Sequence, residues 1–196
     1  MNTIPNRYVL AITGASGMPY ALKLIQELKK NPGLELHLII SNAAKDILPM
    51  ESRGWEKIVT LADHAYAQDQ LTAPMASGSW LHHGMVVCPC SMATLAAIAN
   101  GLGNNLIHRA ADVCLKENRP LVLVPRETPL NAIHLQNMCK AQQAGAVILP
   151  PSPGFYHQPQ TIDDLISQIV SRIMDHLGIE NNIFKRWGTE MFEFKV

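Results

Sequence analysis

The sequence carries no surplus of charge of either sign. Its 196 residues include 16 lysines and arginines and 16 aspartates and glutamates, which cancel at pH 7. A nucleic-acid-binding surface needs clustered basic residues and a peripheral membrane surface needs a polybasic patch, so this balance argues against both classes of partner. Charged residues are also few, at 16% against 47% apolar residues. The apolar excess favours an oligomer that covers part of its surface, with a small molecule or a protein as the partner.

Long apolar runs and paired cysteine motifs are missing as well. No segment reaches the roughly 20 apolar residues of a membrane-spanning helix, and the apolar stretch near the N-terminus is too short for a signal peptide. The four cysteines (Cys88, Cys90, Cys114 and Cys139) lie in apolar segments without C-x-x-C spacing. This pattern predicts reduced, buried thiols rather than disulfides or a zinc site. We therefore expect a cytoplasmic protein.

The sequence also has no internal repeat, low-complexity stretch or linker, and short apolar runs alternate with helical patterns along it. This alternation predicts one doubly wound, mostly parallel α/β sheet with helices on both faces. We expect a single domain over residues 1–178 and a C-terminal tail, 179–196, that packs on a neighbouring subunit or over the active site. Residues 52–83 have the weakest pattern and suit a helix and loops at one sheet edge, with an edge strand as an option. The predicted strands cover residues 7–13, 34–40, 85–88, 121–124 and 146–150.

The segment LVLVPRETPLN, residues 121–131, organises the rest of the chain. Its apolar run predicts an interior strand, and Arg126 and Glu127 follow directly in a strand-to-helix turn. Thr128 is expected to cap the next helix, with Pro129 as its first residue. Ligands of open α/β sheets bind beyond the carboxyl ends of the strands, so this turn is predicted to face a ligand. By itself the pair also fits a surface salt bridge.

Three other turns are predicted at the same end of the sheet. Gly14–Gly17 (GASG) joins the first strand to a helix, and its backbone N–H groups with the Ser16 hydroxyl suit an anion or phosphate, or only a tight connection. Ser41 follows the second strand and precedes a helix that holds Glu51, and Ser91 opens a later helix. Both serines are typical helix caps. The convergence of these turns on one rim strengthens the prediction of a binding site there.

Cationic and aromatic residues come from two further helical regions. Arg109 and Lys116 are seven residues apart and lie on nearly one helix face, which suits either a phosphate or an ordinary solvated face. Tyr156 lies among prolines at the carboxyl end of a strand. Residues 161–177 form the clearest predicted helix, capped by Thr161 with Asp164, and Arg172 borders its apolar face.

Four motifs together resemble the UbiX family of flavin prenyltransferases, formerly described as aromatic-acid decarboxylases: ITGASG, VCPCSMATLAAIANG, RAADVCLKENRPLVLVPRETPLN and PPSPGFYHQPQTIDDLI. The resemblance covers nearly the whole chain. It implies a Rossmann-like flavoprotein fold, FMN bound between subunits and a homododecamer built from trimers. It also implies that dimethylallyl monophosphate alkylates reduced FMN at N5 and C6, without a metal, to give prenylated FMN for a UbiD-type decarboxylase.

The resemblance also implies roles for individual residues. Those expected to be catalytic are Ser16, Glu51, Arg109, Lys116 and Glu127. Those expected to contact FMN are Gly14, Ala15, Ser16, Ser41, Ser91, Met92, Ala93, Thr94 and Arg126. Those expected around the prenyl phosphate are Arg109, Lys116, Glu127, Tyr156 and Arg172 together with Ser16, while Trp187 is similar to a tail aromatic that packs against the prenyl group. Pro19 and Asn42 differ from many members of the family.

Two other functions compete with the transferase. An FMN-dependent cysteine decarboxylase of the same fold is expected to carry a PxMNxxMW motif, whereas this chain has PLNAIHLQNM at the nearest position. A flavin carrier that serves a partner decarboxylase would bind FMN and leave it unchanged. Turnover of FMN in the presence of a prenyl donor separates the transferase from both.

Overall fold

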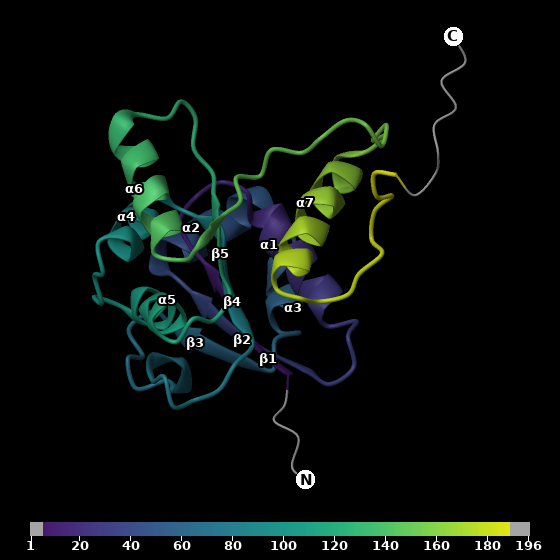
Figure 1. Ribbon diagram of the computed structural model, residues 1–196. Coiled ribbons are helices and arrows are strands. Elements are labelled where there is room, and N and C mark those ends of the chain that lie inside the picture. The colour runs from purple at the N-terminus through teal and green to yellow at the C-terminus, as the bar shows by residue number, and fades with distance from the viewer. Residues whose placement is uncertain (1–5, 189–196) are drawn as a thin grey trace.

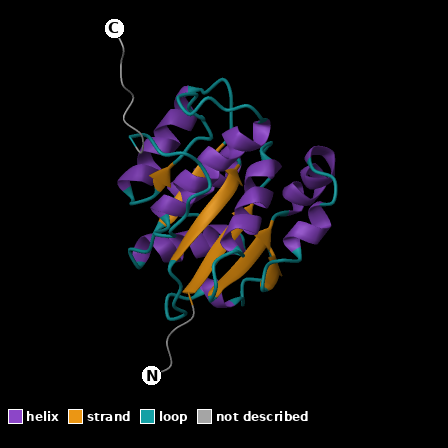
Figure 2. Cartoon of the chain, turned by 90° about the vertical axis from the view of Figure 1, so that its right-hand side faces the viewer, coloured by secondary structure: helices purple, strands orange, loops and turns teal. Residues whose placement is uncertain are grey.

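The protein forms one six-stranded parallel sheet in the order β3-β2-β1-β4-β5-β6, in a computed structural model that describes residues 6–188. Figures 1 and 2 show helices on both faces of this sheet. The predicted doubly wound, Rossmann-like α/β fold is confirmed. The elements are β1 (Asn6–Ile12), α1 (Met18–Leu28), β2 (Leu34–Ile40), α2 (Asn42–Glu51), α3 (Trp55–Val59), β3 (His64–Ala67), η1 (Pro74–Ala76), β4 (Gly84–Cys90), α4 (Met92–Ala99), α5 (Leu106–Lys116), β5 (Leu121–Pro125), α6 (Ala132–Gln143), β6 (Val147–Ile148) and α7 (Ile162–His176).

Alternate residues of the central strands face two separate apolar cores. In β1, Leu10 and Ile12 pack with α1 and α7, whereas Val9 and Ala11 pack with α4 and α5. This is the period of two that a strand covered on both faces requires. α5 and α7 consequently lie on opposite faces of the sheet, as Figure 1 shows.

The sheet reverses its winding direction between β1 and β4, which are neighbours although β2 and β3 separate them in sequence. A crevice forms at such a point because the crossover connections leave in opposite directions, and ligands of open α/β sheets bind there. Every pairing in the sheet is parallel, so the carboxyl ends of the strands share one rim. The fold thus brings the predicted turns toward one another.

The start of α6 differs from the prediction. The Thr128–Pro129 peptide is cis, and the helix begins at Ala132 rather than at Pro129. Asn131 is the cap: its side chain accepts a hydrogen bond from the backbone N–H of His134, and the His134 ring accepts one from the Asn131 N–H. The prediction was wrong because an Asn–His capping box outcompetes a threonine followed by proline.

The start of α7 agrees with the prediction. The Thr161 side chain accepts from the Asp164 N–H, and the Asp164 carboxylate accepts from the Thr161 N–H at 2.8 Å. The chain after α7 then turns back on the same helix. Asn181 is buried against Ser171, and Arg186 pairs with Asp175. The predicted tail therefore contacts its own domain as far as Trp187, and residues 189–196 lie outside the described part.

The cysteine prediction holds for three of the four residues. Cys88, Cys90 and Cys114 are free and buried, but Cys139 is exposed. The reason is that α6, which carries Cys139, buries only Ala141 in the described chain. Within residues 6–188, no helix has both the length and the apolar character needed to cross a bilayer.

Candidate functional site

A pocket of about 350 Å³ lies beyond the carboxyl ends of β1, β2 and β4. The turns that follow these strands form much of its wall, together with the start of α5. Five of the predicted cofactor contacts line it, although they are far apart in sequence. The lining residues are Gly14, Ser41, Ala43, Gln68, Ser91, Ala93, Thr94, Asn105, Ile107 and His108.

Thr13 joins the two strands at the winding reversal. Its Oγ1 donates to the Pro89 carbonyl at 2.8 Å and accepts from the Ser91 N–H at 2.8 Å. Thr13 is 1% exposed, so both bonds are protected from water. This residue fixes the β1 turn against the β4 turn, and the sequence reasoning missed it. The available signal was a hydroxyl directly between a buried strand and a glycine turn.

The two serines act as helix caps. Ser41 Oγ accepts from the Ala44 N–H at 3.1 Å, and Ser91 Oγ accepts from the Thr94 N–H at 3.2 Å while donating to the Thr94 hydroxyl at 3.0 Å. The helices α2 and α4 therefore start at the pocket with their partially positive ends toward it. Both serines therefore fix the positions of the helix starts, as expected for helix caps.

Gly14 allows the first turn to approach α2. A Cβ at this position would lie 2.5 Å from the Cβ of Ala43, which is closer than side-chain carbons approach in proteins. Gly17 has φ of 117°, in the left-handed region, and precedes α1 as its N-cap. Both glycines are therefore required by the backbone conformation of this turn. The close approach of Gly14 to Ala43 forms part of the pocket wall.

The anion predicted for the glycine turn is supplied by the chain itself. Glu51 Oε2 accepts from the backbone N–H groups of Gly17 at 2.8 Å and Met18 at 2.9 Å. Burial alone would raise the pKa of Glu51, but hydrogen bonds from Ser16, Gly17 and Met18 and the nearby positive charge of Arg126 hold the pKa below its ordinary value. Glu51 is therefore ionised at neutral pH and occupies the N-terminus of α1. The N–H groups of Gly17 and Met18 are therefore taken by Glu51 and are not free for a phosphate.

Two buried polar atoms at this rim have no hydrogen-bond partner in the described chain. They are Arg126 Nε, in the turn after β5, and His108 Nδ1, in the first turn of α5. Buried polar groups are almost always satisfied, so these atoms indicate a ligand with polar groups. Burial also lowers the pKa of His108, which keeps the imidazole neutral at pH 7. His108 is a pocket residue that the sequence reasoning missed.

Gln68 is another pocket residue that was not predicted. It follows β3, its backbone carbonyl accepts from the Leu106 N–H at 2.7 Å, and its side-chain oxygen accepts from the Asn42 N–H at 3.3 Å. Gln68 thus contacts the starts of both α5 and α2. Gln68 lies in residues 52–83, where the sequence pattern is weakest and contains no motif that indicates a site.

The remaining predicted site residues at this rim are less enclosed. Ala15 is buried in the first turn, and Met92 and Arg126 are partly buried at the starts of their segments. Glu127 is exposed, and its Oε1 accepts from the N–H of Thr128 at 2.9 Å. Glu127 therefore holds its own turn in the single chain.

The predicted phosphate ligands do not converge within one chain. Arg109 and Lys116 lie on α5, where Arg109 pairs with Asp112 and Lys116 with Glu117. Lys116 ends the helix, about 12 Å along its axis from the pocket residue His108 at an ordinary helical rise. Arg172 lies on α7, across the sheet from α5. A phosphate site that contains all three cations requires residues from more than one copy of the chain.

Tyr156 and Trp187 do come together. Their ring centroids are 5.2 Å apart with the ring planes at 90°, an edge-to-face contact, and Trp187 is 70% exposed. Both lie beside α7, on the same side as Arg172. The sequence reasoning placed them in one substrate set, and the structure brings this aromatic pair together.

Comparison with known proteins agrees with the geometry. A model of the Flavoprotein family matches residues 2–174. Flavin prenyltransferase UbiX of Methanocaldococcus jannaschii is 48% identical over 184 residues, covering 93% of this chain and 99% of the relative. The crystal structure of AnUbiX (PadA1) in complex with FMN and dimethylallyl pyrophosphate has a TM-score of 0.92 and 43% identity, covering 96% of this chain and 100% of that chain.

A second solved structure shows the same similarity. The dodecameric FMN-dependent UbiX-like decarboxylase from Escherichia coli O157:H7 has a TM-score of 0.89 and 42% identity, covering 92% of this chain and 98% of that one. The resemblance inferred from the four sequence motifs is thus confirmed over nearly the whole length. The chain belongs to the Flavoprotein family and, within it, to the UbiX flavin prenyltransferases.

Proposed function

We propose that the protein transfers a dimethylallyl group from dimethylallyl monophosphate to N5 and C6 of reduced FMN and releases prenylated FMN. The observation that carries this proposal is the pocket at the winding reversal, which the partially positive starts of α2 and α4 face and which His108, with its unpartnered Nδ1, lines. A second unpartnered nitrogen, Arg126 Nε, lies in the turn after β5 at the same rim. Reduced FMN supplies the nucleophilic ring atoms when it is bound.

The residues at the rim suit a flat polar ring with a phosphate tail. Small side chains and helix starts let the ring approach the backbone closely, and Arg126 and His108 offer nitrogens to its polar edge. The residues that we propose as cofactor contacts are Gly14, Ala15, Ser16, Ser41, Ser91, Met92, Ala93, Thr94 and Arg126. We also propose Gln68 and His108, because both line the pocket.

Glu51 and Ser16 form the proton-handling part of the proposed site. The Ser16 side chain is hydrogen-bonded to the ionised Glu51 carboxylate, which backbone N–H groups hold in place. A proton that leaves the Ser16 hydroxyl therefore has an acceptor already positioned in Glu51. Contacts with the α1 N-terminus keep Glu51 ionised before the transfer, so that it is able to accept this proton as a general base.

The proposed phosphate site uses positive charge from several copies. Loss of phosphate from an allylic carbon builds negative charge on the leaving oxygens, and Arg109, Lys116 and Arg172 supply cations for it. Each charge-assisted hydrogen bond contributes about 1.5–3 kcal/mol. Tyr156 adds a hydroxyl, Trp187 offers an aromatic wall for the prenyl chain, and we assign Glu127 to the same site.

We further propose a homododecamer built from trimers, a UbiD-type decarboxylase as the recipient of the product, and a cytoplasmic location. The split of the cations between opposite faces of the sheet supports the first, because a site shared between copies completes the set. Three free, buried thiols support a reducing compartment.

The direct test is a turnover assay under anaerobic conditions. The protein is mixed with FMN, a reductant and either dimethylallyl monophosphate or dimethylallyl diphosphate, and the flavin is analysed by mass spectrometry and absorbance. A flavin heavier by one dimethylallyl group, formed faster from the monophosphate, is expected. Unchanged FMN with both donors would refute the proposal and favour a flavin carrier.

A further inference from the structure

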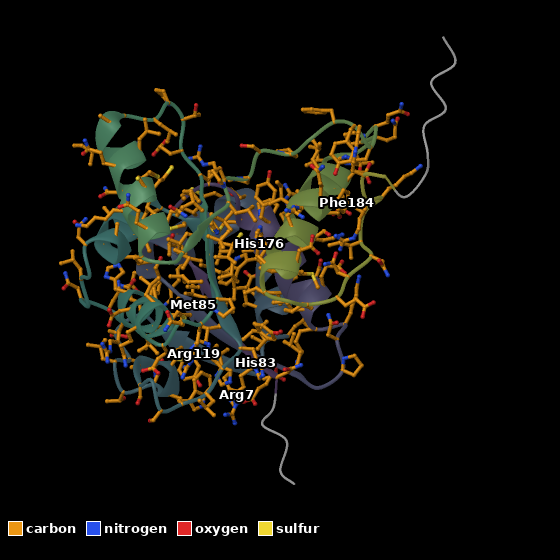
Figure 3. All side chains as sticks on the ribbon, in the orientation of Figure 1. Arg7, His83, Met85, Arg119, His176 and Phe184 are labelled. Atoms are coloured by element: carbon orange, nitrogen blue, oxygen red, sulfur yellow. The ribbon has the colours of Figure 1, made fainter. Side chains whose placement is uncertain are left out.

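A second cluster of chemically active side chains lies at the opposite ends of the strands from the pocket. It consists of Glu35 and His37 on β2 and His64 on β3, and their ligand-type atoms all lie within 4.8 Å of one another. Arg7, which contacts Glu35, lies near the N-terminal end of the described chain (Figure 3). The proposed prenyl transfer uses none of these residues.

Strand geometry explains why the three side chains converge. Glu35 and His37 are two residues apart on one strand, so their side chains point to the same face. His64 is the register partner of His37 on the neighbouring strand. The two imidazole rings stack with centroids 4.7 Å apart. The backbone therefore sets the arrangement, which makes it more rigid than a cluster on loops.

One carboxylate oxygen faces both imidazoles. Glu35 Oε1 lies 3.0 Å from His37 Nε2 and 3.2 Å from His64 Nε2. Ligands of a tetrahedral zinc ion, with bonds of about 2.0–2.2 Å, are separated by roughly 3.3 Å. The two distances from Glu35 Oε1 are close to this separation, and the three ligand atoms all lie within 4.8 Å of one another.

Two further residues orient these ligands as an outer shell. Arg7 Nε donates to the other Glu35 oxygen, Oε2, at 3.1 Å, which leaves Oε1 directed at the imidazoles. The Tyr66 hydroxyl lies 3.1 Å from His37 Nδ1, and so fixes the ring and accepts the N–H when Nε2 carries a metal. Metal-bound histidines characteristically have such a partner on the second ring nitrogen. Arg7 also lies over the Trp80 ring, 5.2 Å from its centroid, which limits its approach to the ion position.

We propose that Glu35 Oε1, His37 Nε2 and His64 Nε2 bind one zinc ion. Two imidazoles and a carboxylate suit this cation, and three protein ligands leave the fourth position to water. The side chain of His64 is 51% exposed, which gives the ion a route in from solvent, whereas that of His37 is 4% exposed. An ion at this position ties β3, a four-residue edge strand, to its neighbour β2.

The test uses the full-length protein after chelator treatment and removal of any tag. Zn²⁺ is titrated in competition with a chromophoric chelator, in wild type and in the variants His64→Ala and Glu35→Gln. Wild type is expected to bind one Zn²⁺ per chain, and both variants to lose that site. Tyr66→Phe is expected to weaken binding by about 10–100-fold, the usual cost of losing an outer-shell partner.

Matched controls separate a built site from surface histidines. His176→Ala and Glu180→Gln remove exposed side chains of the same types outside the cluster, and both are expected to bind Zn²⁺ as wild type does. A large excess of Mg²⁺ should not compete, because Mg²⁺ prefers oxygen ligands in octahedral geometry. Loss of binding in His64→Ala is not explained by misfolding, because the side chain is exposed. Absence of stoichiometric Zn²⁺ binding in wild type would overturn the proposal, as would its retention in His64→Ala.

Discussion

The contact between Glu51 and the start of α1 gives a stability prediction that can be worked out in detail. In Glu51→Gln, the amide oxygen can still accept from Gly17 and Met18, so the shape is kept and the charge is lost. The stabilising charge at the helix N-terminus disappears with it. Glutamine also cannot attract Arg126.

The expected magnitude follows from the two backbone bonds. A hydrogen bond to a charged acceptor contributes about 1.5–3 kcal/mol and one to a neutral acceptor about 0.5–1.5 kcal/mol, so two such bonds lose roughly 2 kcal/mol. Glu51 is partly exposed, and solvent screening reduces this to about 1–2 kcal/mol. For a domain of this size the melting temperature should fall by about 2–8 °C.

The pH dependence has a definite sign. The folded-state pKa of Glu51 lies below the ordinary value of 4.5, so the carboxylate contributes its full stabilisation above that pH. The contribution is lost as the pH falls through the folded-state pKa, because wild type then carries a neutral side chain as well. The difference between wild type and Glu51→Gln should therefore be full at pH 7 and shrink below about pH 4.5.

Thermal unfolding of the flavin-free protein at fixed concentration, from pH 7 down to the acid limit of the fold, measures this difference. Glu180→Gln is the control, because it removes an exposed carboxylate outside the helix start and should not change the melting temperature. An unchanged melting temperature for Glu51→Gln at pH 7 would refute the assignment. If the melting temperature of Glu51→Gln stayed below that of wild type by the same amount in acid, the role of the charge would be refuted.

Three other substitutions test the pocket and the transfer site. Gly14→Ala should destabilise the protein by about 1–3 kcal/mol in urea unfolding, because its Cβ meets that of Ala43, and a neutral result would contradict the close packing. Arg126→Met should weaken FMN binding by about 10–100-fold in a fluorescence titration, the equivalent of one charge-assisted hydrogen bond; unchanged affinity would remove Arg126 from the pocket. Lys116→Ala should leave FMN bound but abolish most prenyl transfer by the mass assay, whereas Lys57→Ala on exposed α3 should be neutral; full turnover by Lys116→Ala would favour flavin storage.

Local sequence patterns predicted most of the fold. The central strands are recognisable because they are buried on both faces and read as continuous apolar runs, as in residues 121–124. Thr161 with Asp164 marked the start of α7 because both partners of the capping box lie within one turn. The cap at Asn131 was missed because its partner is a histidine, which is not part of the usual pattern.

The site was predictable only where a functional residue follows a strand. Gly14, Ser41, Ser91 and Arg126 could be placed at one rim because parallel strands end together. His108 lies inside an ordinary helix pattern, and nothing in the sequence says which helix end meets the rim.

Contacts between distant segments were beyond local reasoning. The contact between Glu51 and the first turn joins residues 33 and 34 positions apart. The zinc cluster needs the register between β2 and β3, which is set by the packed sheet rather than by either strand alone. The division of the cations between opposite faces likewise depends on which face each helix covers.

Gln68 links the starts of α2 and α5, two helices that are far apart in the sequence. Its backbone oxygen receives the first N–H of α5, and its side-chain oxygen receives the first N–H of α2. A displacement of either helix start therefore pulls on the same residue, and through it on the other start. Gln68 thus holds the starts of α2 and α5 at a fixed distance from the end of the short edge strand β3.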